Sequence, residues 1–157
     1  MKTLTRKTAS AASRSKADGV VRSYVQGESK GGKGLGASNL IRALKSGLPL
    51  EELSELQRNL ELSSDKLVPL LGISKATLHR RQAEGRLDVA ESDRVVRFAR
   101  LLGRAASVME SLENGRLWLL TPQVGLGGAI PLWYADTEVG AREVENLLGR
   151  IEHGVYS

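Results

Sequence analysis

The residues that could do chemistry are concentrated between Ser74 and Gln82. Apart from a few small or apolar positions, the side chains of this stretch can all donate hydrogen bonds. They are Ser74, Lys75, Thr77, His79, Arg80, Arg81 and Gln82. Arginine matches the acceptor edge of guanine, and glutamine matches adenine. The stretch therefore predicts contact with nucleic acid, with Gln82 at the rim and the other six residues nearest to the bases. The alternative is a helical hairpin whose Arg80–Arg81 pair faces water.

The chain lacks the residues that most enzyme and metal sites need. It has no cysteine and two histidines, His79 and His153. This composition excludes a disulfide scaffold, a thiolate zinc site and a histidine-rich metal site. No set of serine, histidine and aspartate, and no pair of carboxylates, stands in a supporting context. We therefore expect no catalysis, no cofactor and no metal ion.

Two short helices with a glycine turn between them must position these side chains. Ser64 is expected to cap the first helix, and Ser74 to cap a second helix over residues 75–84. Gly72 and Ile73 make the turn between them. This is the helix-turn-helix pattern. We expect Leu71, Ile73 and Leu78 to pack inward. Two positions depart from the common pattern, since Pro69 falls inside the first helix and Arg81 replaces an apolar residue.

The rest of the chain predicts an all-α fold. Helices are expected over residues 39–45, from Leu50, from the capping box Asp88-x-x-Glu91 and from Thr137 to Gly154. Glu113-Asn114-Gly115 is expected to break the long helix that follows Asp88, and a short helical piece around Trp118 to come next. Gly149 lies inside the last helix, where glycine is unfavourable, and this predicts a packing reason for it.

Charge divides the chain into segments of opposite character. Residues 1–34 carry eight Lys and Arg against two Asp and Glu, and they are expected to be a mostly disordered basic arm. Within this arm Val20, Val21 and Tyr24 could form a short helix or strand. Residues 75–104 have a net charge of +4 and residues 105–157 of −4. Residues 1–34 and 75–104 would together form a surface that binds a polyanion. Residues 105–157 are acidic and would repel DNA, so they need another role.

Three arginines of the second basic segment share one helix face. Arg97, Arg100 and Arg104 could contact phosphates, or they could pair with nearby Glu and Asp side chains. We favour the pairing, because charged stripes on exposed helices are common.

Four groups of residues between about 40 and 157 resemble, in order and spacing, the Xre/MbcA/ParS antitoxins of bacterial RES-type toxin–antitoxin pairs. The groups are Leu71-Gly72-Ile73-Ser74-Lys75-Ala76-Thr77-Leu78; Glu84-Gly85-Arg86-Leu87 with Glu91-Ser92-Asp93-Arg94; Trp118-Leu119-x-Thr121-Pro122 with Leu126-Gly127-Gly128 and Pro131-Leu132; and Asp136-Thr137-Glu138-x-Gly140-Ala141 with Gly149-Arg150-Ile151-Glu152-His153-Gly154. The arm 1–34 lies outside the resemblance.

The resemblance implies a cytoplasmic antitoxin made of two parts. Residues 35–104 would be a helix-turn-helix region that binds operator DNA and dimerises. Residues 105–157 would bind a RES-domain toxin, an enzyme that consumes NAD or transfers ADP-ribose, and would cover its active site. The toxin is expected to meet Trp118, Trp133, Arg150, His153, Val155, Tyr156 and Ser157.

Steering of the toxin is expected from acidic side chains near the end of the chain. Glu138, Glu143, Glu145 and Glu152 would attract a basic toxin surface.

Two other functions remain open for the chain as a whole. One is a transcription regulator without a toxin, whose last third only dimerises, and the other is a helical adaptor that binds no DNA.

Overall fold

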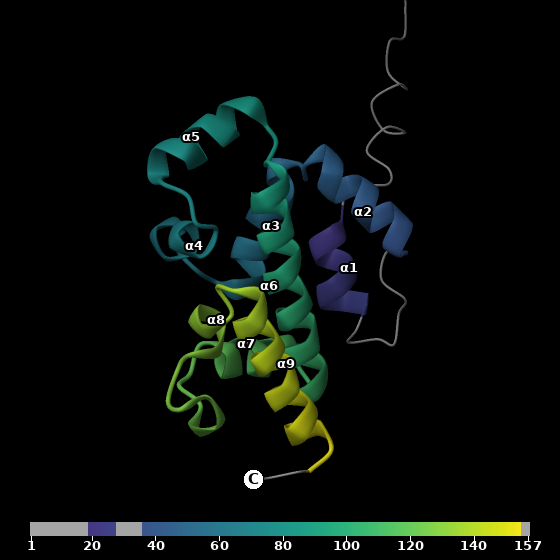
Figure 1. Ribbon diagram of the computed structural model, residues 1–157, viewed down its shortest axis with the longest axis vertical. Coiled ribbons are helices and arrows are strands. Elements are labelled where there is room, and N and C mark those ends of the chain that lie inside the picture. Colours follow the sequence, from purple (N-terminus) through teal and green to yellow (C-terminus); the bar gives the residue numbers. More distant parts are fainter. Residues whose placement is uncertain (1–18, 28–35, 155–157) are drawn as a thin grey trace, which may run out of the picture.

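The computed structural model describes residues 19–27 and 36–154, and every regular element in these ranges is a helix (Figure 1). The predicted all-α class is confirmed. The elements are α1 (Val20–Gly27), α2 (Ala37–Ser46), α3 (Leu50–Leu60), α4 (Ser64–Leu70), α5 (Lys75–Glu84), α6 (Val89–Val108), α7 (Leu112–Leu119), the 3-10 turn η2 (Val124–Leu126), α8 (Pro131–Tyr134) and α9 (Glu138–Glu152).

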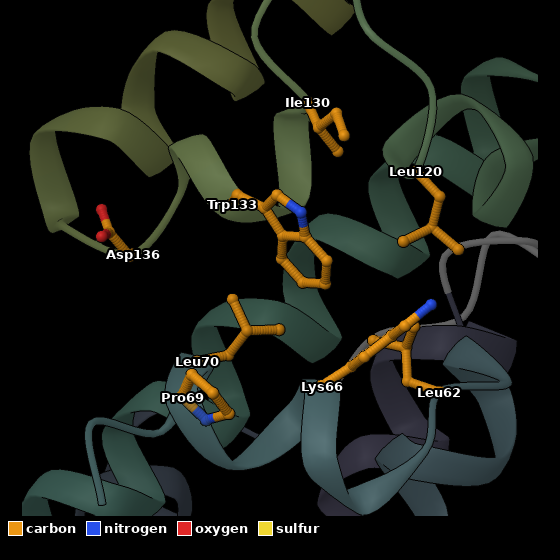
Figure 2. A pocket seen from close by; sticks show the side chains of 8 residues that line it. All are labelled: Leu62, Lys66, Pro69, Leu70, Leu120, Ile130, Trp133 and Asp136. Carbon is orange, nitrogen blue, oxygen red and sulfur yellow. The ribbon is translucent and has the colours of Figure 1, made fainter.

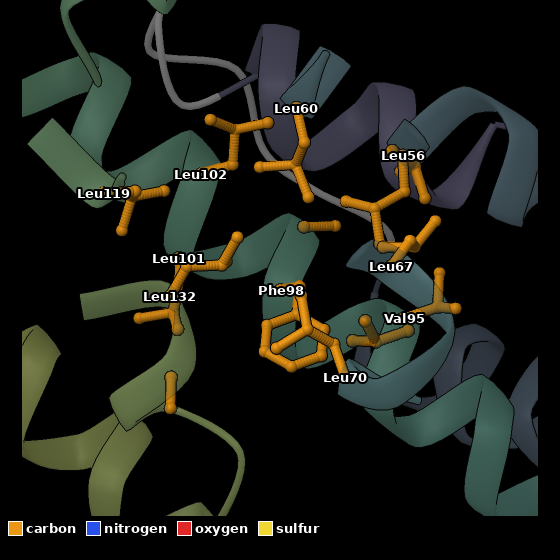
Figure 3. Packing of buried hydrophobic residues seen from close by; sticks show 14 of the residues in the cluster. Leu56, Leu60, Leu67, Leu70, Val95, Phe98, Leu101, Leu102, Leu119 and Leu132 are labelled. Carbon is orange, nitrogen blue, oxygen red and sulfur yellow. The ribbon is translucent and has the colours of Figure 1, made fainter. Parts of the chain in front are cut away.

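Helix α6 is the axis on which the other elements assemble. It begins with the predicted capping box, in which Asp88 accepts from the Glu91 amide and Glu91 from the Asp88 amide. Helices α1, α2, α3, α7 and α9 all pack against it (Figure 1). Its side chains Phe98, Leu101 and Leu102 are fully buried and meet leucines from both halves of the chain (Figure 3). One hydrophobic core therefore joins the helix-turn-helix region to the last third.

The helix-turn-helix pair forms as the sequence predicts, but the expected cap at Ser64 is wrong, because Ser63 is the N-cap of α4 and its side chain makes no capping bond. Ser74 caps α5 by accepting a hydrogen bond of 3.1 Å from the Thr77 amide. Leu71 is fully buried, and Ile73 and Leu78 pack against the core as expected. Pro69 lies one residue before the end of α4, so its missing N–H costs at most one bond of a seven-residue helix.

Part of the expected basic arm is instead a helix in the core. Helix α1 buries Val20 and Val21 completely and Val25 almost completely. Its first amides donate to the buried Glu52 carboxylate, at 2.5 Å from Gly19, 3.1 Å from Val20 and 2.9 Å from Val21. The expectation of disorder is therefore wrong for residues 19–27, while residues 1–18 and 28–34 lie outside the described residues. A deletion meant to test the basic segment has to end before Gly19.

The break after α6 occurs earlier than the sequence predicts. The turn lies at residues 109–111, where Glu110 has a positive φ of 68°, and Ser111 then caps α7. Gly115 was expected to end a helix, yet it is buried inside α7. A Cβ atom at this glycine would lie 2.5 Å from the Ala106 nitrogen of α6. The glycine is therefore there for close contact between two helices, and Glu110 makes the turn.

Helix α9 begins at Thr137 as predicted, but the expected packing reason for Gly149 is absent. The Thr137 hydroxyl accepts from the Gly140 amide at 3.0 Å. Nothing lies within 4 Å of the position that a Cβ atom would take at Gly149. Within the described residues, this glycine has no neighbour that requires it.

Replacing Gly149 with alanine should therefore stabilise the chain. Alanine loses less backbone entropy in a helix than glycine does, and the expected gain is about 0.5–1 kcal/mol. The measurement is the midpoint of urea unfolding. Gly140→Ala is the matched comparison and should destabilise, because a Cβ atom there would overlap the carbonyl oxygen of Tyr134. A loss of stability in Gly149→Ala would contradict the conclusion that no neighbour requires a glycine at this position.

Candidate functional site

Helix α5 is weakly embedded and presents most of the predicted DNA-binding residues. It has no buried residue. Ser74, Lys75, His79 and Arg80 are exposed, and Thr77 is half-buried. Lys75 pairs with Asp65 of α4 at 2.8 Å, with both side chains largely in solvent. Arg80 forms no ion pair with any described residue, so its guanidinium is available to a ligand.

Arg81 does not face outward as expected. Its Nε donates to both Glu91 oxygens at 3.0 and 2.8 Å, and its Nη atoms reach Glu84 at 3.0 Å and Asp88 at 3.2 Å. Glu91 and Glu84 raise the pKa of Arg81, and the guanidinium stays charged. The side chain ties α5 to the start of α6. The N–H groups of Arg81 are occupied by partners within the chain. Arg81 therefore fixes α5 to α6 and does not belong to the outward face of α5.

Three further arginines bind helix carboxyl ends within the chain. Arg86 donates to the Gly47 oxygen at 2.6 Å after α2, and Arg94 donates to the Leu71 oxygen after α4. Arg116 donates to the Asn59 oxygen at 2.8 Å near the end of α3. Cations at these ends satisfy free carbonyls and oppose the negative end of the helix dipole. Much of the basic charge of residues 75–104 is therefore structural.

The arginine stripe of α6 pairs with α9. Arg97 Nε lies 3.3 Å from Glu138, Arg100 Nε lies 2.7 Å from Glu145, and Arg104 bonds to Glu152. The hydrogen bond from Arg104, with its charge, lowers the pKa of Glu152. The interpretation as pairing with nearby acids is confirmed.

The same pairs correct the expectation about electrostatic steering. Glu138, Glu145 and Glu152 face α6, where arginines neutralise them, so they do not form an acidic outer surface. Of the four carboxylates expected to steer a toxin, Glu143 is the one that forms no ion pair with a described residue. The acidic total of residues 105–157 therefore overstates the charge that a partner would meet.

Trp133 stands over an open apolar groove of about 660 Å³ between α4 and α8 (Figure 2). The indole is 38% exposed and points from α8 toward α4. The groove is lined by Leu62, Lys66, Pro69, Leu70, Leu120, Ile130, Trp133 and Asp136. Sequence reasoning selected Trp133 but missed the groove, because its walls come from segments far apart in the chain and share no local motif.

The other predicted toxin-binding residues lie elsewhere. Trp118 is half-buried against the core. Arg150 is half-buried in the last turn of α9, and the exposed His153 ends this helix. Helix α9 has 15 residues and is about 22 Å long, with α8 before its start and His153 after its end. Val155, Tyr156 and Ser157 lie outside the described residues. Of the described members of the predicted set, Trp133 lies on α8 before the start of α9, Arg150 and His153 lie at its end, and Trp118 lies on α7.

No other kind of site is found in the part of the chain that the structure describes. Residues 19–27 and 36–154 contain no group of three or more acidic or histidine side chains arranged to hold a metal ion. None of the described helices has the length and apolar character that crossing a bilayer requires.

Two family models match this chain, one in each half. Residues 40–100 match the family model of the antitoxin Xre-like helix-turn-helix domain. Residues 104–154 match the model of the antitoxin Xre/MbcA/ParS C-terminal toxin-binding domain. Helix α1 lies outside both matches.

Three curated relatives are named Antitoxin Xre. The protein from Yersinia enterocolitica is 33% identical over 120 residues, covering 75% of this chain and 81% of the relative. The protein from Photorhabdus laumondii is 33% identical over 121 residues, covering 76% and 82%. The protein from Pseudomonas putida is 31% identical over 90 residues, covering 57% and 54%.

The families to which the matched domains and relatives belong are not enzymatic, which confirms that the chain is no enzyme. Its helix-turn-helix and toxin-binding domains support the role of an antitoxin. The chain belongs to the Xre/MbcA/ParS family of antitoxins.

Proposed function

We propose that this antitoxin neutralises a RES-domain toxin through residues 105–157 and represses its own operon through residues 35–104. The observation that carries the proposal is the distribution of uncommitted side chains. His79 and Arg80 are exposed on α5 at one end of α6 and form no ion pair with a described residue. The exposed Lys75 beside them pairs with the exposed Asp65. Trp133 lies in the segment matched by the toxin-binding family model, which supplies one wall of the groove, while α4 of the helix-turn-helix domain supplies the other. Between them the cations and carboxylates of α6 and α9 neutralise each other.

The toxin class is proposed from the residue groups that resemble antitoxins of RES toxins. The test is co-expression with the product of the neighbouring reading frame. We expect that product alone to lower cellular NAD and stop growth, and we expect co-expression of this chain to restore both. The two proteins should also co-purify. If the chain binds DNA but neither binds nor silences the neighbouring product, the proposal fails in favour of a transcription regulator without a toxin.

The DNA-binding part is tested with two adjacent arginines of α5. Arg80→Ala should cost about 1–3 kcal/mol of binding to a duplex selected from a random pool and should relax its sequence preference, because Arg80 is free to contact a guanine. Arg81→Gln should lower the same preference without changing the salt dependence, because its side chain holds the helix rather than a phosphate. The measurement is affinity for selected and random duplexes at several salt concentrations.

Each of the two variants has an outcome that would contradict the role proposed for its arginine. Equal losses of Arg80→Ala on selected and random duplexes would make Arg80 a phosphate contact. A weaker salt dependence in Arg81→Gln would show that Arg81 leaves its acidic partners to meet DNA.

We further propose that the chain acts in the cytoplasm as a homodimer. Helix-turn-helix proteins commonly bind two half-sites with two copies, about one DNA turn apart. Light scattering of the purified chain and the symmetry of the selected duplex test this together. A monomer on an asymmetric site would contradict it.

A further inference from the structure

Helix α2 carries an outward face on which nothing is acidic. The helix contains no Asp or Glu. Leu40, Ala43 and Leu44 turn toward the core, and the opposite face presents Ser38, Arg42 and Lys45 at a spacing of four and three residues. All three of these outward residues are exposed. The outer face of α2 therefore offers a hydroxyl and two cations in a row about 10 Å long.

The two cations of this face have no task within the described part of the chain. Neither Arg42 nor Lys45 forms an ion pair or a side-chain hydrogen bond with a described residue. A lysine in the last turn of a helix could compensate the helix dipole. In α2 this role is already filled, because Arg86 donates to the Ser46 oxygen at 3.3 Å and to the Gly47 oxygen at 2.6 Å. In contrast, Arg97, Arg100 and Arg104 of α6 form ion pairs with glutamates of α9.

The carboxyl ends of α2 and α5 are held next to each other. Arg86, which binds the end of α2, directly follows Gly85, the residue that ends α5. The Leu50 amide donates to the Gly85 oxygen at 3.1 Å, and Pro49 forms a bridge with Arg86. In Figure 1, α2 and α5 lie on either side of the start of α6, at the end of the molecule away from the end of α9. A duplex across this end would meet both helices.

We propose that Arg42 and Lys45 bind backbone phosphates beside the base pairs that α5 reads, so that α2 is a second DNA-contacting helix. The inference rests on the proposed DNA binding and adds a surface to it. The ligand is the phosphate backbone of duplex DNA, because the cations are exposed and form no ion pair with a described residue, and because the end of α2 is held beside the end of the recognition helix. Such contacts raise affinity by releasing counterions and fix the register of the protein without reading bases.

The double variant Arg42→Ala/Lys45→Ala tests the proposal in the full chain. The slope of log affinity against log salt should become shallower by about 1.8 for each bound copy, and so by about 3.6 for the proposed dimer, because each lost phosphate contact removes about 0.9. Affinity should fall about tenfold or more at 0.15 M salt, equally for a duplex selected from a random pool and for a random duplex. The preferred sequence should not change. Arg42→Ala alone should remove about half of this slope change.

Two single variants act as controls. Arg142→Ala removes an exposed arginine without an ion pair to a described residue, on α9, and should keep the wild-type slope. Arg42→Lys keeps the charge and should also keep the slope. All four variants alter exposed side chains, so their melting temperatures should equal that of the wild type.

The outcomes separate this proposal from the one on which it depends. A wild-type chain that binds DNA, with an unchanged slope in the double variant, overturns the role of α2 alone. A loss of sequence preference in the double variant overturns it as well, since phosphate contacts carry no such information. A wild-type chain that binds no duplex overturns both proposals. Weaker binding to the toxin, with DNA binding intact, would assign the face of α2 to the toxin and overturn the inference.

Discussion

Replacing Glu52 with alanine is expected to lower the free energy of unfolding by about 3 kcal/mol. Glu52 is 4% exposed, and its carboxylate accepts hydrogen bonds from the amide of Gly19, just before α1, and from the first two amides of α1. Alanine would leave these donors without an acceptor at a largely buried helix end, and hydrogen bonds to charged groups contribute about 1.5–3 kcal/mol each. The loss is smaller than the sum because α1 can detach and expose its amides to water. Urea unfolding monitored by circular dichroism measures the change.

Glu51→Ala is the matched control on the neighbouring residue. Glu51 is exposed in the same first turn of α3, so its removal should change stability by about 0.5 kcal/mol or less. Deleting residues 1–27 removes α1 and with it the three donors. In that background Glu52→Ala should cost much less than in the full chain. Equal effects of Glu51→Ala and Glu52→Ala in the full chain would contradict the capping role.

Sequence reasoning succeeded where a few neighbouring residues decide the structure. Ser74, Thr137 and the Asp88–Glu91 box each cap a helix whose first turn they belong to, and all act as predicted. Here the side chain and the amide that it accepts from are three residues apart, so the spacing alone specifies the contact.

The errors come from partners that are distant in sequence. The acceptor for α1 is Glu52, more than 30 residues away, and a segment rich in Ser, Gly and Lys shows no sign of it. Val20, Val21 and Val25 were the available signal, because this spacing puts three valines on one face of a helix. Gly115 was misread for the same reason, since its close neighbour is Ala106 of another helix.

Charge was the least reliable guide, because a count does not say which charges are paired. Residues 75–104 contain eight Lys and Arg. Six of these are arginines that bind carboxylates or helix ends within the chain: Arg81, Arg86, Arg94, Arg97, Arg100 and Arg104. The candidate DNA-binding surface is therefore smaller than the net charge predicts, and the proposed recognition depends more on Arg80.

Trp133→Ala is expected to weaken the complex with the toxin about 30-fold or more. Exposed tryptophans beside an apolar groove are typical anchors of protein interfaces, and their loss costs about 2 kcal/mol or more. Trp133 fits this description, since 38% of its surface is exposed and it projects over the groove between α8 and α4. The measurements are calorimetric affinity for the product of the neighbouring reading frame and the amount of antitoxin needed to silence it.

Val124→Ala is the control, because Val124 is 96% exposed in the same domain and is not among the residues that line the groove. It should leave toxin affinity unchanged, and both variants should keep the DNA affinity of the wild type. If Trp133→Ala binds the toxin as tightly as the wild type, the groove is not the anchor. The interface would then lie at the end of α9 that carries Arg150 and His153. In that case Arg150→Ala and Tyr156→Ala, and not Trp133→Ala, would release toxin activity.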